Sequence, residues 1–219
     1  MVAIVMLLAV LLGSAPQVPD RAGQSPQDLA DAAEADFTFG RLEDALAKYD
    51  RLAALVPDVA PYLWQRGIAL YELGRYDACA AQFASFHRVD RRDLENATWH
   101  FLCSARASTP KAALEGVLAA GPDPRVLRTE IHEMVLGRMS PDELMALANT
   151  SVPLVRFYAH LYVGYYLEAT GRSAAALEHF TAAASEEFSG EGGFLNVVAR
   201  VHLARLGRRA LGPNSTRSN

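Results

Sequence analysis

From Ser25 onward, the pattern of apolar and polar positions carries helix signals and almost no strand signals. Ser25 and Ser140 each precede a proline and an acidic residue, an arrangement that caps the first turn of a helix. Gly40, Gly74 and Gly171 stand where helices should end, because glycine accepts the left-handed backbone of a C-cap. We therefore predict an all-α chain of about eleven helices, each of roughly 10–17 residues, joined by short loops.

The helix pattern repeats with a spacing of 34 residues. The matched positions of the first two copies are Gly40 and Gly74, Ala45 and Cys79, and Tyr49 and Phe83. The pattern returns near the C-terminus at Gly164, Gly171, Ala176, Phe180 and Ala183. Small and aromatic residues at fixed offsets in this period are typical of tetratricopeptide repeats, each of which is a pair of antiparallel helices. One pair cannot bury its apolar face alone, so we predict a right-handed solenoid of stacked pairs.

Within each pair, we expect a small residue on the first helix to face a small residue on the second, because the backbones approach closely there. The first-helix set is Ala33, Gly67 and Gly164, and the second-helix set is Ala45, Cys79 and Ala176. The aromatic residues Tyr49, Phe83 and Phe180 should fill the space where the next helix stacks.

The middle of the chain is a degenerate version of this repeat. Further helices are expected at residues 96–107, 111–119, 126–136 and 141–148, with a rigid turn at 121–124. An amphipathic helix at 196–207 should cap the stack. The repeat domain is therefore expected to span residues 26–207 and to be followed by a disordered polar tail at 208–219.

The N-terminal segment breaks the pattern with an unbroken apolar run, Met1 to Leu12, followed by small residues. The run is too short to cross a bilayer, which needs about 20 apolar residues. It fits a secretory signal peptide at 1–18 followed by a linker at 19–25, so we expect export to the periplasm, the medium or a membrane surface. An uncleaved anchor and a mis-assigned start remain alternatives, and the lipid-attachment cysteine of bacterial lipoproteins is absent.

Composition and charge narrow the function classes. The 219 residues are 51% hydrophobic and 21% charged, with a formal net charge of -4. This balance argues against a nucleic-acid binder, which should carry a basic stripe. Two cysteines, Cys79 and Cys103, are too few for a disulfide scaffold, but they could bond to each other in an oxidising compartment.

Candidate catalytic chemistry is sparse. None of the six histidines has a metal-ligand spacing, and the nearest approach is residues 130–133, Glu-Ile-His-Glu. Ser108 and Lys111 match the S-x-x-K of serine β-lactamases, but the partner motifs are missing and a helix start explains the residues equally well. The sequence predicts no cofactor and no metal ion.

The remaining candidates are residues on the concave face of the predicted solenoid, which the first helix of each pair should line. These groove residues are Trp64, Ile68, Tyr71, Trp99, Tyr158, Leu161, Tyr165 and Glu168. Aromatic residues dominate many protein interfaces, which favours partner contact. The alternative is that the degenerate middle folds over these residues and buries them in the core.

Beyond the generic repeat, the order of features between Tyr62 and Gly207 resembles the bacterial NlpI-type tetratricopeptide lipoproteins. The resembling segments are residues 66–71 (RGIALY), 99–102 (WHFL), 130–139 with Leu144, and 157–167 (FYAHLYVGYYL) with Gly171. The resemblance implies a non-catalytic adaptor at the cell envelope that scaffolds hydrolases and a protease and can form a homodimer. The missing lipid-attachment cysteine and the smaller number of N-terminal repeats depart from that family.

Together these features predict a scaffold that binds protein or peptide partners and catalyses nothing. Two other classes stay open: an exported serine hydrolase that uses Ser108 and Lys111, and a structural subunit whose groove is filled by its own helices.

Overall fold

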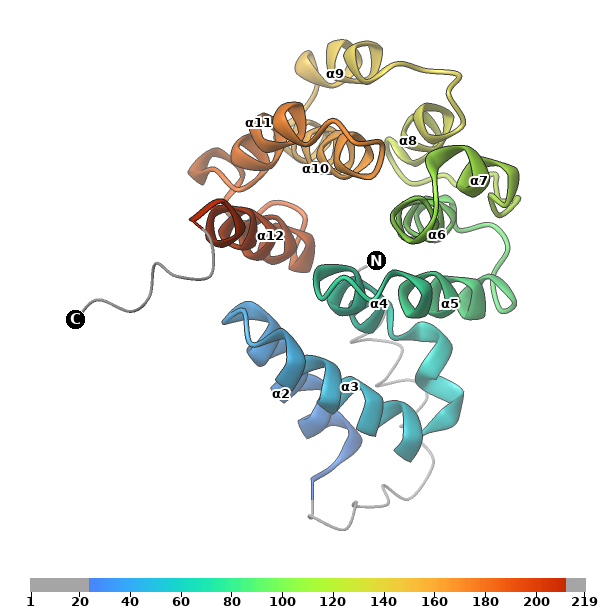
Figure 1. Cartoon of the computed structure of the whole chain (residues 1–219), viewed down its shortest axis with the longest axis vertical. Coiled ribbons are helices and arrows are strands. Elements are labelled where there is room, and N and C mark those ends of the chain that lie inside the picture. The colour runs from blue at the N-terminus through green and yellow to red at the C-terminus, as the bar shows by residue number, and fades with distance from the viewer. Residues whose placement is uncertain (1–23, 212–219) are drawn as a thin grey trace, which may run out of the picture. The chain divides into compact units, whose positions relative to one another are not determined.

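The computed structural model of the chain describes residues 24–211, so the expected signal peptide and most of the linker and tail lie outside it. The described part is all-helical and contains no strand, as the sequence pattern predicts (Figure 1). Its helices are α2 (Pro26–Thr38), α3 (Leu42–Leu55), η1 (Pro57–Tyr62), α4 (Trp64–Glu72), α5 (Tyr76–His87), α6 (Leu94–Ala107), α7 (Pro110–Glu115), α8 (Arg128–Val135), α9 (Pro141–Asn149), α10 (Pro153–Ala169), α11 (Ser173–Ala183), η2 (Glu186–Phe188) and α12 (Phe194–Leu211).

The chain divides into two compact units, where the sequence analysis expected one domain. Unit 1 ends at Arg91 and unit 2 begins at Arg92. No helix of the described residues is long and apolar enough to cross a membrane.

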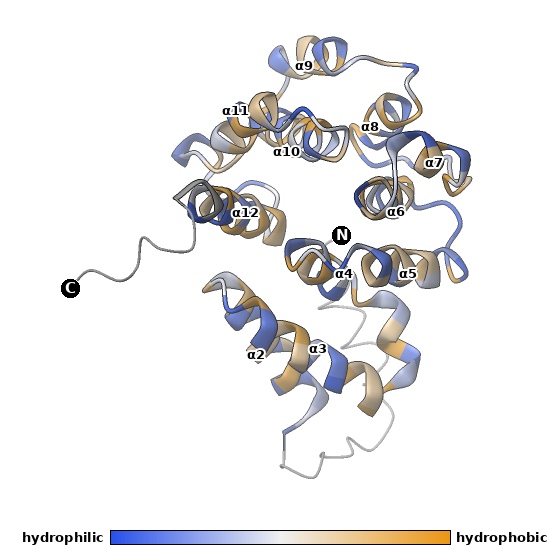
Figure 2. Cartoon of the chain, in the orientation of Figure 1, coloured by the Kyte–Doolittle hydropathy of each residue, from blue (hydrophilic) through white to orange (hydrophobic). Residues whose placement is uncertain are grey.

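Unit 1 consists of two helical hairpins, α2 with α3 and α4 with α5. Helix α3 also packs against η1 and α4, which joins the two hairpins. The side chains of Leu29, Leu52, Val59 and Leu63 form an apolar cluster within this unit. Apolar and polar residues alternate around these helices, so each presents an apolar stripe to its neighbours (Figure 2).

Three hairpins share one turn, and these are the three that the 34-residue pattern marks. Gly40, Gly74 and Gly171 have φ angles of 71°, 75° and 84°, in the left-handed region that glycine adopts without a Cβ penalty. The amide of the next residue, always an arginine, donates to a carbonyl of the last helical turn in the Schellman arrangement. The prediction that helices end at these glycines is confirmed.

The capping devices of the sequence also form. Asp28 N donates to Ser25 Oγ at 3.1 Å, and Glu143 N donates to Ser140 Oγ at 3.2 Å. In both cases the acidic side chain accepts from the serine amide in return, which completes a capping box.

The small residues of the hairpins have a different neighbour from the one expected. A Cβ added at Gly67 would lie 2.6 Å from the ring of Phe83, and one at Gly164 would lie 3.0 Å from the ring of Phe180. The glycine of the first helix therefore makes room for the aromatic ring of the second helix. The expected approach of Gly67 to Cys79 stays a prediction.

Unit 2 is less regular before α10. Helix α6 packs against α7, α8 and α10, while α10 also packs against α9 and α11. Helix α7 ends at Glu115, short of the expected residue 119. Helix α12 packs on α11 and extends to Leu211, beyond the predicted end at 207.

Candidate functional site

The predicted groove residues of unit 1 lie on α4, and two of the three are buried. Ile68 and Tyr71 have exposed fractions of 0% and 2%, while Trp64 is half-buried. Tyr71 packs edge-on against Tyr76, with ring centroids 5.4 Å apart. Helix α4 contacts α3 and α5, and seven of its nine residues are buried, so little of its surface remains for a partner. Ile68 and Tyr71 are therefore core residues, which corrects their expected exposure.

The same correction applies to unit 2. Trp99, Leu161 and Tyr165 are fully buried, and the rings of Trp99 and Tyr165 lie 4.8 Å apart. The structure thus brings two of the predicted residues together, but inside the core. The cause is that α10 has neighbours on several sides, whereas an ideal solenoid would leave one face of it open. Tyr158 is half-buried and keeps some accessible surface.

Glu168, the last predicted groove residue, belongs to a buried ion cluster. Its carboxylate lies 3.5 Å from Arg106 Nη1 of α6 and 3.8 Å from His202 Nε2 of α12. The His202 ring packs on Phe180, with centroids 4.1 Å apart. Glu168 of α10 therefore links α6 and α12 within unit 2.

A second buried ion cluster, which the sequence analysis missed, centres on Glu95 of α6. Arg128 Nε donates to Glu95 Oε2 at 3.0 Å, and Arg125 Nη1 lies 3.3 Å from the same oxygen. The Tyr162 hydroxyl of α10 donates to Glu95 Oε1. Burial lowers the pKa of Arg128, but the Glu95 carboxylate together with Tyr162 and Tyr158 outweighs burial and raises that pKa.

The loop before α8 completes this Glu95 cluster. Arg125 Nη2 donates to Asp93 Oδ1 at 2.6 Å and also pairs with Asp123. Burial raises the pKa of Asp123, yet the hydrogen bonds and charge of Arg125, together with the Leu94 amide, outweigh burial and hold that pKa below its ordinary value. Every charge of the cluster faces an opposite charge, and the contacts of the cluster connect α6, the loop before α8, α8 and α10.

The Glu95 cluster extends to the accessible Tyr158. The Arg128 guanidinium lies 4.2 Å from the centroid of the Tyr158 ring, within cation–π distance. The signal in the sequence is the group of three charged residues within 123–128, Asp123, Arg125 and Arg128, in a segment expected to form only a turn and a helix start.

A pair of histidines is a further feature that the sequence spacing did not reveal. His160 Nδ1 of α10 and His179 Nδ1 of α11 lie 3.2 Å apart. His132, within the segment 130–133, is instead buried in α8, while Glu133 pairs with Arg138 at 3.2 Å. Among the described residues, no group of three or more His, Cys, Asp or Glu side chains could hold a metal ion.

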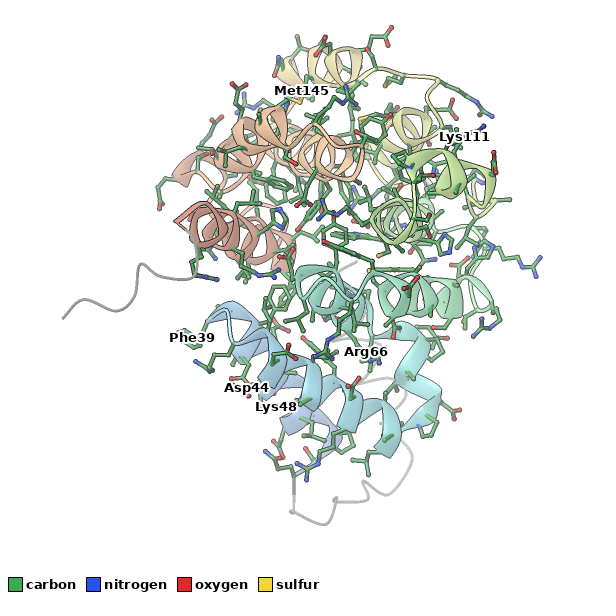
Figure 3. The ribbon with its side chains drawn as sticks, viewed as in Figure 1. Phe39, Asp44, Lys48, Arg66, Lys111 and Met145 are labelled. Atoms are coloured by element: carbon green, nitrogen blue, oxygen red, sulfur yellow. The ribbon has the colours of Figure 1, made fainter. Side chains whose placement is uncertain are left out.

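Ser108 and Lys111 lie at the junction between α6 and α7. The Ser108 hydroxyl donates to the Ser104 carbonyl at 2.9 Å, and Thr109 caps α7 by accepting from the Ala112 amide. Both Ser108 and Lys111 are exposed, and Lys111 lies on the outer surface of α7 (Figure 3).

Cys79 and Cys103 are fully buried, which agrees with the reading of Cys79 as a small buried residue. Neither is a free thiol, as the possible disulfide requires. Peptide mass spectrometry under non-reducing conditions tests whether these two cysteines pair with each other.

The chain matches no protein-family model, and no curated protein matches it. The resemblance to tetratricopeptide and NlpI-type proteins therefore rests on the order of residues in this chain. Arguments about function have to come from the hairpins and clusters described above.

Proposed function

We propose that the protein is a non-catalytic helical scaffold of the tetratricopeptide type that binds protein or peptide partners. The observation that carries the proposal is the recurrence of one hairpin design at α2/α3, α4/α5 and α10/α11. These hairpins share the left-handed glycine and the following arginine at the turn. In the second and third of them, a glycine also lies against an aromatic ring. Repeated hairpins of this kind stack into solenoids whose surfaces bind other proteins.

The proposal includes an exported location and envelope partners. The apolar run at residues 1–12 supports export. The resemblance to NlpI-type lipoproteins adds hydrolases and proteases as the partner class, with a homodimer as a further possibility of the same family.

Trp64 and Tyr158 are the predicted groove residues that keep accessible surface, so they are the positions to test. We expect Trp64→Ala and Tyr158→Ala to reduce the recovery of partners that the wild-type chain captures from its native source. Asp77→Ala, at an exposed site on α5, is the matched control and should leave recovery unchanged. Circular dichroism and the thermal midpoint of each variant separate lost binding from lost folding. Equal recovery by all four proteins would contradict the proposal.

The burial of six groove residues favours a second candidate, a structural subunit whose groove is filled by its own helices. That reading predicts that Trp64→Ala and Tyr158→Ala lower stability without changing what the chain captures. Sedimentation of the purified chain distinguishes this case further, because a structural subunit should form a discrete assembly at micromolar concentration.

A further inference from the structure

The histidine pair of unit 2 lies between two antiparallel helices whose relative position is set by tight packing. His160 is on α10 and His179 is on α11, and their ring centroids are 5.3 Å apart. Phe180, the neighbour of His179, lies against Gly164, one helical turn after His160. The helices therefore hold the two imidazoles together independently of any contact between the rings.

Both rings are half-buried and face one another through Nδ1. When both imidazoles are neutral, the Nδ1–H of one ring can donate to the Nδ1 of the other. When both are protonated, two N–H donors point at each other and repel. Burial lowers the pKa of His160, and the proximity of His179 lowers it further. Burial also lowers the pKa of His179. The lowered pKa values favour the neutral imidazole, which is the form that coordinates a metal ion.

The separation of the two nitrogens also suits a shared ion. Two nitrogen ligands at 2.0–2.1 Å from a tetrahedral zinc ion are about 3.3–3.4 Å apart. The observed Nδ1–Nδ1 distance is 3.2 Å. A metal ion can therefore replace the shared proton after rotation of the rings and without movement of the helices.

The surroundings of the pair favour a cation. The carboxylate of Glu187 acts on His160, and those of Glu178 and Asp142 act on His179. One cation opposes them, because Arg156 lies near His160 and pairs with Glu187 at 2.6 Å. The sum of the four charges is negative, which raises the local concentration of divalent ions.

We propose that His160 and His179 form a two-imidazole binding site for a divalent transition-metal ion such as Zn²⁺ or Cu²⁺. The Nδ1 atoms are the protein ligands, and water fills the remaining positions, since the described residues hold no third ligand. Imidazole suits both ions, and the order of divalent affinities places Cu²⁺ above Zn²⁺. The site does not depend on the scaffold function proposed above.

The test is calorimetric titration of the untagged full chain with Zn²⁺, accompanied by His160→Ala, His179→Ala and the control His87→Ala. His87 is a half-buried histidine of unit 1 that lies outside the pair. We expect one Zn²⁺ per wild-type chain, and a loss of about tenfold or more in affinity in each pair variant, given that even indirect partners of a metal cost that much. The His87→Ala protein should bind as the wild type does. Electron paramagnetic resonance of the Cu²⁺ form should show coupling to two nitrogens in the wild type and to fewer in each pair variant.

Several results would overturn the site. These are a wild-type chain with no saturable Zn²⁺ binding, a pair variant that binds as tightly as the wild type, or equal weakening by His87→Ala. If an alanine variant loses helix content by circular dichroism, His160→Gln or His179→Gln, which preserve side-chain size better, replaces it in the same titration.

Discussion

Unit 1 and the first half of unit 2 are stabilised by different means. Unit 1 is built from two hairpins of one design over an apolar cluster, and an ion pair that joins its hairpins, Arg75 with Glu43, has side chains that are 50% and 64% exposed. In unit 2, the corresponding link is Glu95 with Arg128, whose side chains are 0% and 4% exposed. The two hairpins of unit 1 are joined by apolar packing and by ion pairs with an exposed partner, whereas a fully buried ion pair joins α6 to α8 in unit 2.

The largest expected effect comes from breaking the buried link. Glu95→Ala leaves Arg128 buried without its main carboxylate, which costs about 3–5 kcal/mol of the free energy of unfolding. Glu43→Ala removes the exposed partner of Arg75 and should cost about 0–1 kcal/mol. Urea denaturation followed by circular dichroism measures both. Similar losses of unfolding free energy in Glu95→Ala and Glu43→Ala would show that the buried and the exposed ion pair contribute equally to stability.

The stability cost of adding a methyl group at the glycine–aromatic contacts should differ between the two units by less than the cost of breaking their ion pairs does. Gly67→Ala places a methyl group 2.6 Å from Phe83, while Gly164→Ala places one 3.0 Å from Phe180. Such overpacking costs about 1–3 kcal/mol, and we expect Gly67→Ala to be the more costly of the two.

A double variant checks the cause of the Gly67→Ala effect. If the Phe83 ring is what the methyl group meets, Gly67→Ala should cost less in a Phe83→Leu background than in the wild type. An unchanged cost in that background would assign the loss to the helix backbone instead.

The features that the sequence predicted correctly are local. The ends of α2, α4 and α10 follow from glycines at 40, 74 and 171, because a left-handed C-cap depends on a few consecutive residues. The hairpins follow from these ends and from the apolar stripes between them. The same logic found the capping boxes at Ser25 and Ser140.

The features that it missed depend on residues far apart in the chain. Glu95 meets Arg128 across 33 residues and Tyr162 across 67. The burial of Ile68, Tyr71 and the other groove residues depends on which helices cover α4 and α10. An ideal solenoid leaves one face of each first helix open, and the repeat pattern alone does not show that the face is covered.

The turn glycines provide a comparison in which the two units should behave alike. Gly74→Ala and Gly171→Ala force alanine into a left-handed conformation but bring the new methyl group within 4 Å of nothing. Each should therefore cost about 1–2 kcal/mol, from the backbone alone. Thermal unfolding of the two variants measures the cost. A large difference between them would show that the turns, and not only the packing around them, differ between the units.

The smallest effect concerns pH and belongs to unit 2. Burial lowers the pKa of both His160 and His179 in the folded chain, so protonation favours the unfolded chain. The stability that the neutral pair contributes is present above the ordinary histidine pKa of about 6.5 and is lost as the pH falls through and below that value. The loss is opposed by three carboxylates that raise the histidine pKa values, those of Glu187, Glu178 and Asp142. The charge of Arg156 lowers the pKa of His160 and adds to the loss. We expect the urea midpoint of the wild type to fall between pH 7 and pH 5 more steeply than that of a His160→Gln/His179→Gln variant. His87→Gln, in unit 1, is the matched control, because burial lowers the pKa of that half-buried histidine too. If the urea midpoints of the His160→Gln/His179→Gln variant and the wild type fall in parallel between pH 7 and pH 5, the histidine pair does not contribute to the acid sensitivity of unit 2.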